Sequence, residues 1–245
     1  MPLFMPSSVR FLVTIHDLTW KRFPETTKPL QCWSERLQMP HSLRKAARII
    51  TISAPIRYDL VRYFPAIQAK DCFVRGDVTY LRPGHVNGCC RCSTHCSSAR
   101  RSGAKTSSVC LRQYAQLAPE LRSAYPLLLA DGHVWTVGID QLVDGLGIHT
   151  DVVALGAVSG AELGYLYSKA GLLLMPSVYE GFGPPSLEAF QFGVPSVTAN
   201  CSSMPEVAGA AGRLVDPLQV ESIRAGIERL LTDQAAYAER VARIP

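Results

Sequence analysis

The sequence of 245 residues lacks an apolar run long enough to cross a bilayer, which takes about 18 residues or more. Its start lacks an early basic region and a small-residue cleavage site, so no signal peptide is predicted. Charged residues make up only 18% of the chain and hydrophobic residues 47%, a globular balance that excludes wholesale disorder. We therefore expect a cytoplasmic protein, and peripheral contact with a membrane stays open.

Cysteine and excess positive charge are scarce outside one segment, residues 72–112. Only Cys32 and Cys201 of the eight cysteines lie elsewhere. The segment holds seven Lys and Arg against one acidic residue, Asp77, so its net charge is +6. The net charge of the whole chain is +5. The rest of the chain therefore sums to −1, and we predict that the basic character belongs to this segment and not to the fold.

Residues 72–112 also lack a hydrophobic period of 2 or 3.6, so we expect them to be irregular. A reading-frame slip that was later restored would explain their composition. An alternative is a zinc site, although its spacing lacks the paired C-x2-C arms of common structural sites; its ligands would be Cys89, Cys90, Cys92, His95 and Cys96. Nucleic-acid binding is a weaker alternative, because few aromatic residues lie among the arginines.

The remaining chain alternates short apolar runs with helical patterns. Strands are predicted at 11–15, 48–52, 127–129, 152–155, 171–175 and 196–199. Helices are predicted at 33–47, 54–64, 139–146, 160–169, 185–192 and 219–231, with Ser53 as the cap of the second and Pro65 as its end. Such alternation predicts an α/β fold with parallel sheets covered by helices on both faces.

The most informative stretch is residues 176–190, PSVYEGFGPPSLEAF, which follows the strand at 171–175. Ligands of open parallel sheets bind beyond the carboxyl ends of strands, and amides at a helix start suit a diphosphate. Gly181 and Gly183 have no Cβ, which permits close approach of a ligand. Glu188, in the first helical turn, is suited to both hydroxyls of a ribose, and Glu180 to sugar hydroxyls, because a carboxylate only accepts hydrogen bonds.

This string resembles glycosyltransferase family 4, whose signature is E-x7-E, and the match continues through residues 193–197, 203–207 and 212–217. The resemblance implies a GT-B fold of two Rossmann-like domains, retention of anomeric configuration, and neither a bound metal nor a cofactor. It also implies that Glu180 contacts the donor sugar and Glu188 the ribose. Gly181, Phe182 and Gly183 would then line the sugar–diphosphate pocket.

A second match lies at residues 13–18, VTIHDL, which resemble the end of a strand in the family's first domain. His16 directly follows that strand, so the resemblance favours a catalytic or sugar-contacting role for it. A structural histidine is the alternative for His16, and a turn or capping residue is the alternative for Asp17.

Three departures from the family pattern are expected to matter. The chain starts shortly before His16, so the first Rossmann-like domain is expected to be incomplete and to lack its glycine-rich loop. The cations that neutralise the leaving diphosphate are not found in 72–112; Arg100, Arg101 and Lys105 do not follow the motif. The final helix also ends early. The predicted organisation is a partial N-terminal domain at 1–71, the aberrant segment at 72–112, and a nucleotide-sugar-binding domain at 113–245.

The predicted function is transfer of a hexose, mannose or glucose, from a nucleotide diphosphate sugar to a glycan, lipid-linked or small-molecule hydroxyl acceptor. One alternative is a catalytically inactive glycosyltransferase-like fragment that still binds a nucleotide. The other is a zinc- or nucleic-acid-binding module at 72–112. The missing diphosphate cations favour inactivity of this exact chain. The main hypothesis, hexose transfer, includes no nucleic-acid partner.

Overall fold

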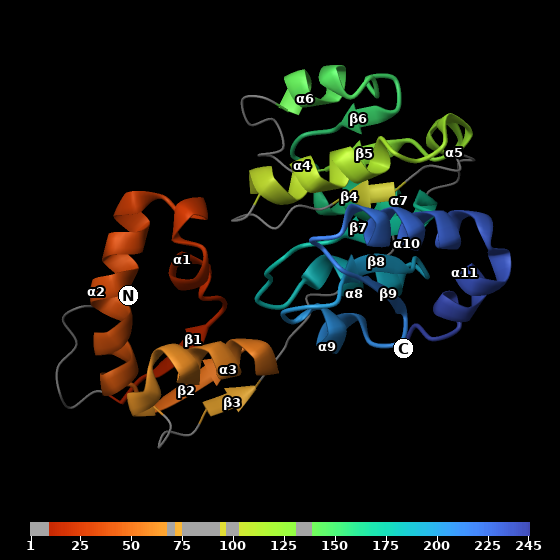
Figure 1. Ribbon diagram of the computed structural model, residues 1–245. Helices are drawn as coiled ribbons and strands as arrows, with labels where there is room; N and C mark the ends of the chain where they lie inside the picture. The colour runs from red at the N-terminus through yellow and green to blue at the C-terminus, as the bar shows by residue number, and fades with distance from the viewer. Residues whose placement is uncertain (1–9, 68–71, 75–93, 97–102, 131–138) are drawn as a thin grey trace. The chain divides into compact units, whose positions relative to one another are not determined.

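The computed structural model describes residues 10–67, 72–74, 94–96, 103–130 and 139–245 (Figure 1). For residues 72–74, 94–96 and 103–107 it describes the backbone only. The chain divides into two units. The first comprises Met1–Asp77 and Tyr179–Phe182, and the second comprises Val78–Val178 and Gly183–Pro245. Within the described ranges, no helix has the length and apolar character needed to traverse a membrane.

The first unit is built on a parallel three-stranded sheet in the order β1-β2-β3, formed by Leu12–Ile15, Arg48–Thr51 and Cys72–Val74. Its helices are α1 (Thr19–Arg22), α2 (Pro29–Lys45) and α3 (Ala54–Tyr63), with 3-10 turns η1 (Pro24–Thr26) and η2 (Pro65–Ile67). Val13 of β1 lies beside Ile49 of β2, and both are buried. The strands therefore form where their sequence predicts, but β1 is buried on one face only: Val13 and Ile15 are buried, whereas Leu12 is 61% exposed.

Helix α3 begins and ends where its sequence indicates. The Ser53 side chain accepts a hydrogen bond from the Ile56 amide, which confirms the predicted cap. Ile56 and Leu60 are fully buried, and Pro65 starts the turn that follows the helix. Helix α2 starts earlier than predicted, at Pro29, because a proline suits the first turn of a helix.

The second unit contains a parallel six-stranded sheet in the order β6-β5-β4-β7-β8-β9. Its strands are Thr94–Cys96, Leu127–Leu129, Val152–Ala154, Leu172–Met175, Ser196–Ala199 and Gly212–Val215, numbered β4 to β9. Its helices are Gly103–Tyr114, Pro119–Ala124, Ile139–Gly145, Gly160–Lys169, Pro184–Gln191, Met204–Ala208, Val220–Thr232 and Gln234–Val241, numbered α4 to α11. Strands β4, β5 and β6 follow one another toward one edge of the sheet, and strands β7, β8 and β9 follow one another toward the other edge. The strand order therefore reverses between the central strands β4 and β7.

The expectation that residues 72–112 are irregular is wrong for the described part of that segment. It contains β3, β4 and most of α4, and β4 pairs with both β5 and β7 in the middle of the sheet. Cys110, Leu111 and Tyr114 follow helical spacing and are fully buried. Strands of three residues are too short to show a period, and for that reason the pattern was missed.

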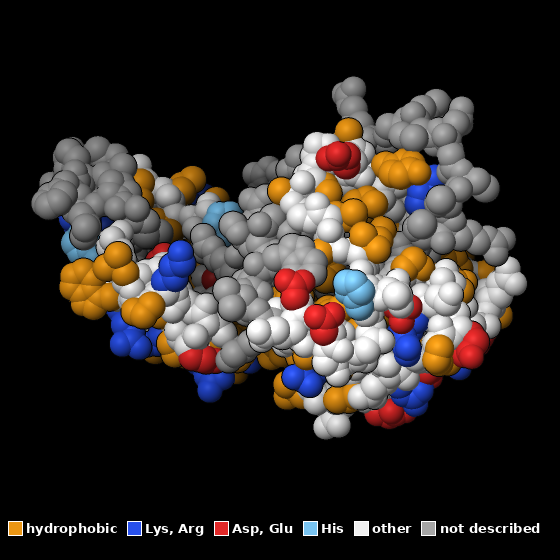
Figure 2. Space-filling view, turned by 90° about the horizontal axis from the view of Figure 1, so that it is seen from above, with side chains coloured by type: hydrophobic (Ala, Val, Ile, Leu, Met, Phe, Trp, Pro, Cys, Tyr) orange, Lys and Arg blue, Asp and Glu red, His pale blue; other side chains and the backbone are white. Residues whose placement is uncertain are grey.

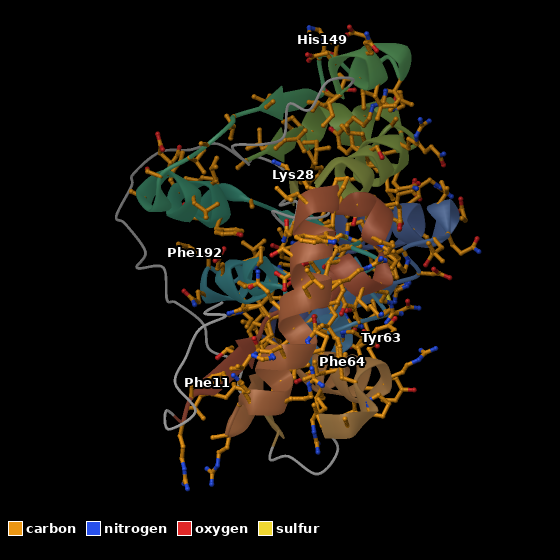
Figure 3. The ribbon with its side chains drawn as sticks, turned by 90° about the vertical axis from the view of Figure 1, so that its left-hand side faces the viewer. Phe11, Lys28, Tyr63, Phe64, His149 and Phe192 are labelled. Carbon is orange, nitrogen blue, oxygen red and sulfur yellow. The ribbon has the colours of Figure 1, made fainter. Side chains whose placement is uncertain are left out.

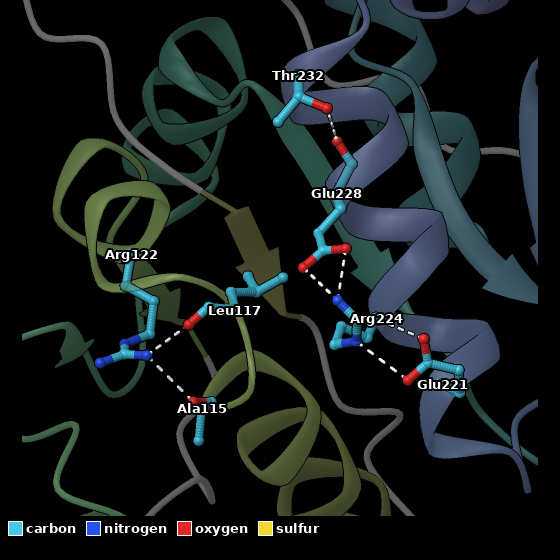
Figure 4. Close-up of polar contacts among 7 residues, drawn as sticks. All are labelled: Ala115, Leu117, Arg122, Glu221, Arg224, Glu228 and Thr232. Atoms are coloured by element: carbon cyan, nitrogen blue, oxygen red, sulfur yellow. Dashed lines mark hydrogen bonds and ion pairs between the residues drawn. The ribbon is translucent and has the colours of Figure 1, made fainter.

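Helix α4 is tied to the following chain by a network of side-chain contacts to main-chain carbonyls. The Tyr114 hydroxyl lies 2.9 Å from the Tyr125 carbonyl oxygen. Arg122 donates to the carbonyls of Ala115 and Leu117 at 3.1 and 2.6 Å (Figure 4) and to the Asp151 carboxylate at 2.7 Å. Burial and the nearby Asp151 charge raise the pKa of Tyr114 above its usual range, so its hydroxyl stays a donor.

The prediction that positive charge belongs only to 72–112 is also wrong. Residues 10–67 carry ten Lys and Arg against four Asp and Glu, whereas residues 139–245 carry six against twelve. The basic excess of residues 10–67 and the acidic excess of residues 139–245 cancel, so the net charge of the chain shows neither of them. On the face drawn in Figure 2, Lys and Arg are frequent over the first unit, at the left, and acidic side chains gather chiefly over the second.

Candidate functional site

The second unit has its ligand-binding edge where the strand order reverses. In open parallel sheets the crevice beyond the carboxyl ends of the strands at such a reversal is the place where ligands bind. Strand β7 borders this point, and all four of its residues are fully buried. The chain leaves β7 at Met175 and enters α8 at Pro184, so the two ends of the stretch singled out from the sequence, residues 176–178 and 183–190, belong to this unit, whereas residues 179–182 belong to the first unit.

The start of α8 depends on a glycine in the left-handed region. Gly183 is the N-cap with φ of +86°, and a Cβ there would lie 2.7 Å from Met204 Sδ. The structure therefore requires this glycine for backbone conformation and packing. Access of a ligand to its backbone, the reason expected from the sequence, stays a prediction.

Helix α8 offers fewer free amides for an anion than the sequence pattern predicts. Pro184 and Pro185 have no N–H, and the Ser186 amide bonds to the Gly183 carbonyl oxygen at 3.2 Å. A diphosphate here would depend mainly on the helix dipole and on groups from other segments.

Glu188 lies in the second turn of α8, so its predicted position in the first turn is wrong; the helix already begins at Pro184. The Tyr167 hydroxyl of α7 donates to Glu188 Oε2 at 3.1 Å. Burial raises the pKa of Glu188, and the Tyr167 hydrogen bond lowers it in part. Tyr167 stacks on Phe192, the residue after α8 that is labelled in Figure 3, with ring centroids 5.9 Å apart. Sequence patterns missed Tyr167.

In the first unit, Gly181 packs against the residue after β1. A Cβ on Gly181 would lie 2.0 Å from the His16 carbonyl oxygen, and the Ser53 hydroxyl donates to the Gly181 carbonyl at 2.7 Å. The His16 side chain is exposed, and its predicted catalytic role stays a prediction. Asp17 accepts a hydrogen bond from the Thr19 amide at 3.0 Å, which gives it the turn role weighed as an alternative.

Tyr179 anchors the Tyr179–Phe182 segment in the core of the first unit. Its ring lies 5.7 Å from the Phe23 ring and 5.2 Å from the Arg22 guanidinium, measured between centres. Arg22 also donates to both carboxylate oxygens of Asp59, at 3.0 and 3.2 Å, and Asp59 is only 3% exposed. Burial and the Asp59 charge raise the pKa of Tyr179 above its usual range. This Arg22–Asp59 pair was not found from the sequence.

Glu180 is buried within the first unit, at 7% exposure, and Phe182 is half-buried there. Because Glu188 belongs to the second unit, the prediction that Glu180 and Glu188 share one pocket mouth stays a prediction. So do the sugar-contacting role of Glu180 and the pocket role of Phe182.

The candidate zinc ligands, and the basic residues that do not follow the diphosphate motif, lie largely outside the described residues. Cys89, Cys90 and Cys92 fall there, as do Arg100 and Arg101, while the backbone of His95 and Cys96 forms part of β4. Among the side chains that are described, no group of three or more His, Cys, Asp or Glu residues could hold a metal ion. The zinc alternative is therefore untested.

Solved structures share this architecture. Sucrose-phosphate synthase from Thermosynechococcus elongatus superposes with a TM-score of 0.75 at 20% identity, over 96% of this chain and 63% of that one. HepE from Anabaena, in complex with UDP and glucose, gives a TM-score of 0.73 at 16% identity, over 96% and 65%. With its parallel sheets and central strand reversal, the chain has the GT-B glycosyltransferase fold, as predicted.

The sequence pattern of the family described as Glycosyl transferases group 1 matches residues 94–244, more than half of the chain, and the chain belongs to this family. O-antigen chain mannosyltransferase B of Escherichia coli is 41% identical over 126 residues, which are 51% of this chain and 33% of that enzyme. The matched region thus spans about a third of this relative's length. The narrower assignment to family 4 and the predicted truncation stay predictions.

Proposed function

We propose that this protein takes part in glycosyl transfer, moving a hexose from a nucleotide diphosphate sugar to a hydroxyl acceptor with retention of anomeric configuration. Mannose is the proposed hexose and glucose the second choice. The bond between the anomeric carbon and the diphosphate breaks, and the diphosphate leaves with the electron pair. The oxygen of the acceptor hydroxyl takes its place on the same face of the sugar, and the hydroxyl proton passes to the departing diphosphate.

The observation that carries the proposal is the Glu188 carboxylate, which is hydrogen-bonded to Tyr167 and lies on α8, the helix that follows β7 at the strand reversal. A carboxylate with one lone pair engaged still has acceptor sites for the two hydroxyls of a ribose. Glu180 is proposed to bind hydroxyls of the donor sugar and His16 to act at the transferred sugar. Gly181, Phe182 and Gly183 are proposed to line the sugar–diphosphate pocket. No metal or cofactor is needed in this scheme.

The relatives support the substrate classes. The E. coli relative is a mannosyltransferase that acts on O-antigen chains by its name, which favours mannose and a glycan or lipid-linked acceptor; a small-molecule acceptor stays open. HepE was solved with UDP and glucose, which supports a nucleoside diphosphate donor.

Calorimetric titration with UDP and GDP tests whether the donor site binds a nucleotide. On the same sample, turnover is measured with the sugar nucleotides in which UDP or GDP carries mannose or glucose. Glu188→Ala is expected to weaken nucleotide binding about 10- to 100-fold, because it removes hydrogen bonds to a charged acceptor. Glu239→Ala, which removes an exposed carboxylate on α11, is the matched control. Binding that is unchanged by Glu188→Ala contradicts the ribose assignment.

The same turnover measurement decides between an active enzyme and the alternative of an inactive, nucleotide-binding relative. We expect turnover to be very weak, because α8 supplies few amides and the sequence of residues 72–112 has no motif of cations for the leaving diphosphate. Turnover at ordinary enzyme rates, with dependence on Glu188, contradicts the inactive alternative.

We also propose peripheral contact of the first unit with an anionic membrane surface. Leu30, Trp33 and Leu37 are 78, 63 and 56% exposed, and their spacing places them on one face of α2. Arg44 continues this face, and residues 10–67 carry ten basic against four acidic residues. Apolar side chains including Trp, flanked by cations, suit an interface with anionic lipid.

Co-sedimentation with vesicles tests this contact. The protein is expected to bind vesicles rich in phosphatidylglycerol, to bind pure phosphatidylcholine weakly, and to lose binding as salt rises. Trp33→Ser is expected to reduce binding, whereas Tyr58→Ser, at an exposed aromatic residue on α3, serves as the control. Equal binding by Trp33→Ser and the unaltered protein contradicts the assigned face.

A further inference from the structure

Tyr167 is a buried residue with a polar group that the proposed reaction has not used. It lies in the last turn of α7 (Gly160–Lys169), directly before β7, and is 1% exposed. The start of α7 is held by a reciprocal capping box, in which Ser159 and Glu162 bond each other's backbone amides at 3.3 and 2.7 Å. The helix that carries Tyr167 is therefore well defined at its start and continues directly into the central strand.

The ring of Tyr167 is held against the helix that carries the carboxylate. It stacks on Phe192 at an interplanar angle of 27°, and Phe192 directly follows α8. The hydroxyl at the far end of the same ring donates to Glu188 Oε2 at 3.1 Å. Ring and hydroxyl therefore contact the two ends of one segment, residues 188–192, and removal of the hydroxyl alone leaves the stacking intact.

The electrostatics of the pair fix which group donates. Burial, and next the charge of Glu188, raise the pKa of Tyr167 above its usual range, so the hydroxyl keeps its proton at neutral pH. The carboxylate can therefore only accept from it. Burial raises the pKa of Glu188, and the hydrogen bond from Tyr167 opposes this shift, so it favours the ionised form that accepts hydroxyl protons.

We infer that Tyr167 is a positioning residue for nucleotide binding: its hydroxyl, 3.1 Å from Glu188 Oε2, orients the Glu188 carboxylate to accept the ribose hydroxyls of the donor. This inference rests on the proposed ribose-binding role of Glu188. It assigns to α7, a helix outside the E-x7-E stretch, a part in selecting ribonucleotides over deoxyribonucleotides.

The test compares Tyr167→Phe with Tyr165→Phe, the same substitution on the same helix two residues away, in the full chain. Calorimetry measures the Kd of UDP or GDP, whichever binds more tightly, and of its 2′-deoxy and 3′-deoxy forms. Tyr167→Phe is expected to weaken binding of the ribonucleotide about tenfold and of the deoxy forms much less. Tyr165→Phe is expected to change neither.

Two further measurements separate positioning from a merely structural role. In a Glu188→Gln background, Tyr167→Phe is expected to have no further effect on ribonucleotide binding, because the two groups act as one unit. Binding is expected to weaken as pH falls through the raised pKa of Glu188, and Tyr167→Phe moves that midpoint to higher pH, because it removes the interaction that lowers the pKa.

The outcomes distinguish this inference from the proposed function. If Glu188→Ala leaves the preference for ribonucleotide unchanged, the ribose-binding role itself fails. If Glu188→Ala abolishes that preference while Tyr167→Phe alters neither it nor the pH midpoint, only the positioning role is overturned. Equal weakening of ribo- and deoxyribonucleotide by Tyr167→Phe, with an unmoved midpoint, overturns it as well.

Discussion

Helix α8 lies between two glycines with left-handed backbone, and they offer a matched pair for testing what the helix start requires. Gly183 precedes the helix with φ of +86° and Gly193 follows it with φ of +72°. A Cβ on Gly193 would meet no atom within 4 Å, whereas one on Gly183 would lie 2.7 Å from Met204 Sδ. Met204 is fully buried, so it has little room to move away.

The expected magnitudes follow from these two environments. An alanine in the left-handed region loses about 1–2 kcal/mol, and the reduced freedom of the unfolded chain returns about 0.4–1 kcal/mol. Gly193→Ala should therefore lower the free energy of unfolding by about 0–1.6 kcal/mol. Gly183→Ala should lower it by about 1–2 kcal/mol more, because it also overpacks the core at Met204.

Urea denaturation followed by circular dichroism measures both free energies of unfolding, provided that the denaturant slope stays constant. A double-mutant cycle adds Met204→Ala, which removes the side chain that the new methyl group would meet. The combined Gly183→Ala and Met204→Ala variant should be more stable than the sum of the single changes predicts, by about 1 kcal/mol. If Gly183→Ala is no more destabilising than Gly193→Ala, the packing argument is refuted.

Two further changes test the first unit. Gly181→Ala is expected to lower the free energy of unfolding of the first unit by about 1–3 kcal/mol, because the new Cβ would lie 2.0 Å from the His16 carbonyl oxygen, which cannot rotate away. Amide hydrogen exchange in the first unit should become faster, and an unchanged exchange rate contradicts the contact. Asp59→Asn is expected to destabilise the first unit by about 1–3 kcal/mol, since it weakens two hydrogen bonds from Arg22 to a buried acceptor; an unaltered urea midpoint argues against the pair.

Local signals in the sequence determined most of the elements. The run at 171–175 predicts β7 because four apolar residues in succession suit a strand buried on both faces. Ser53 and Pro65 predict the two ends of α3, since a cap and a proline act on their own backbone neighbours. The order of residues 176–190 indicated the family without any knowledge of the fold.

Tertiary structure alone decided how distant residues meet. Strand β4 has only three residues and lies in a segment of unusual composition, yet pairing on both edges makes it central in the sheet. Tyr167 and Glu188 lie 21 positions apart, and Arg22 and Asp59 lie 37 apart. No periodic pattern links such pairs, because their contact depends on strand order and helix packing.

The glycines of the candidate site show the same division. The sequence determined that Gly181 and Gly183 lie in the loop that follows β7 and leads into α8. It could not show why a side chain is excluded, because the excluded volume belongs to His16 and Met204, which are distant along the chain. Conformation is a local property that sequence records directly, whereas the space around a residue is decided only when separate segments pack together.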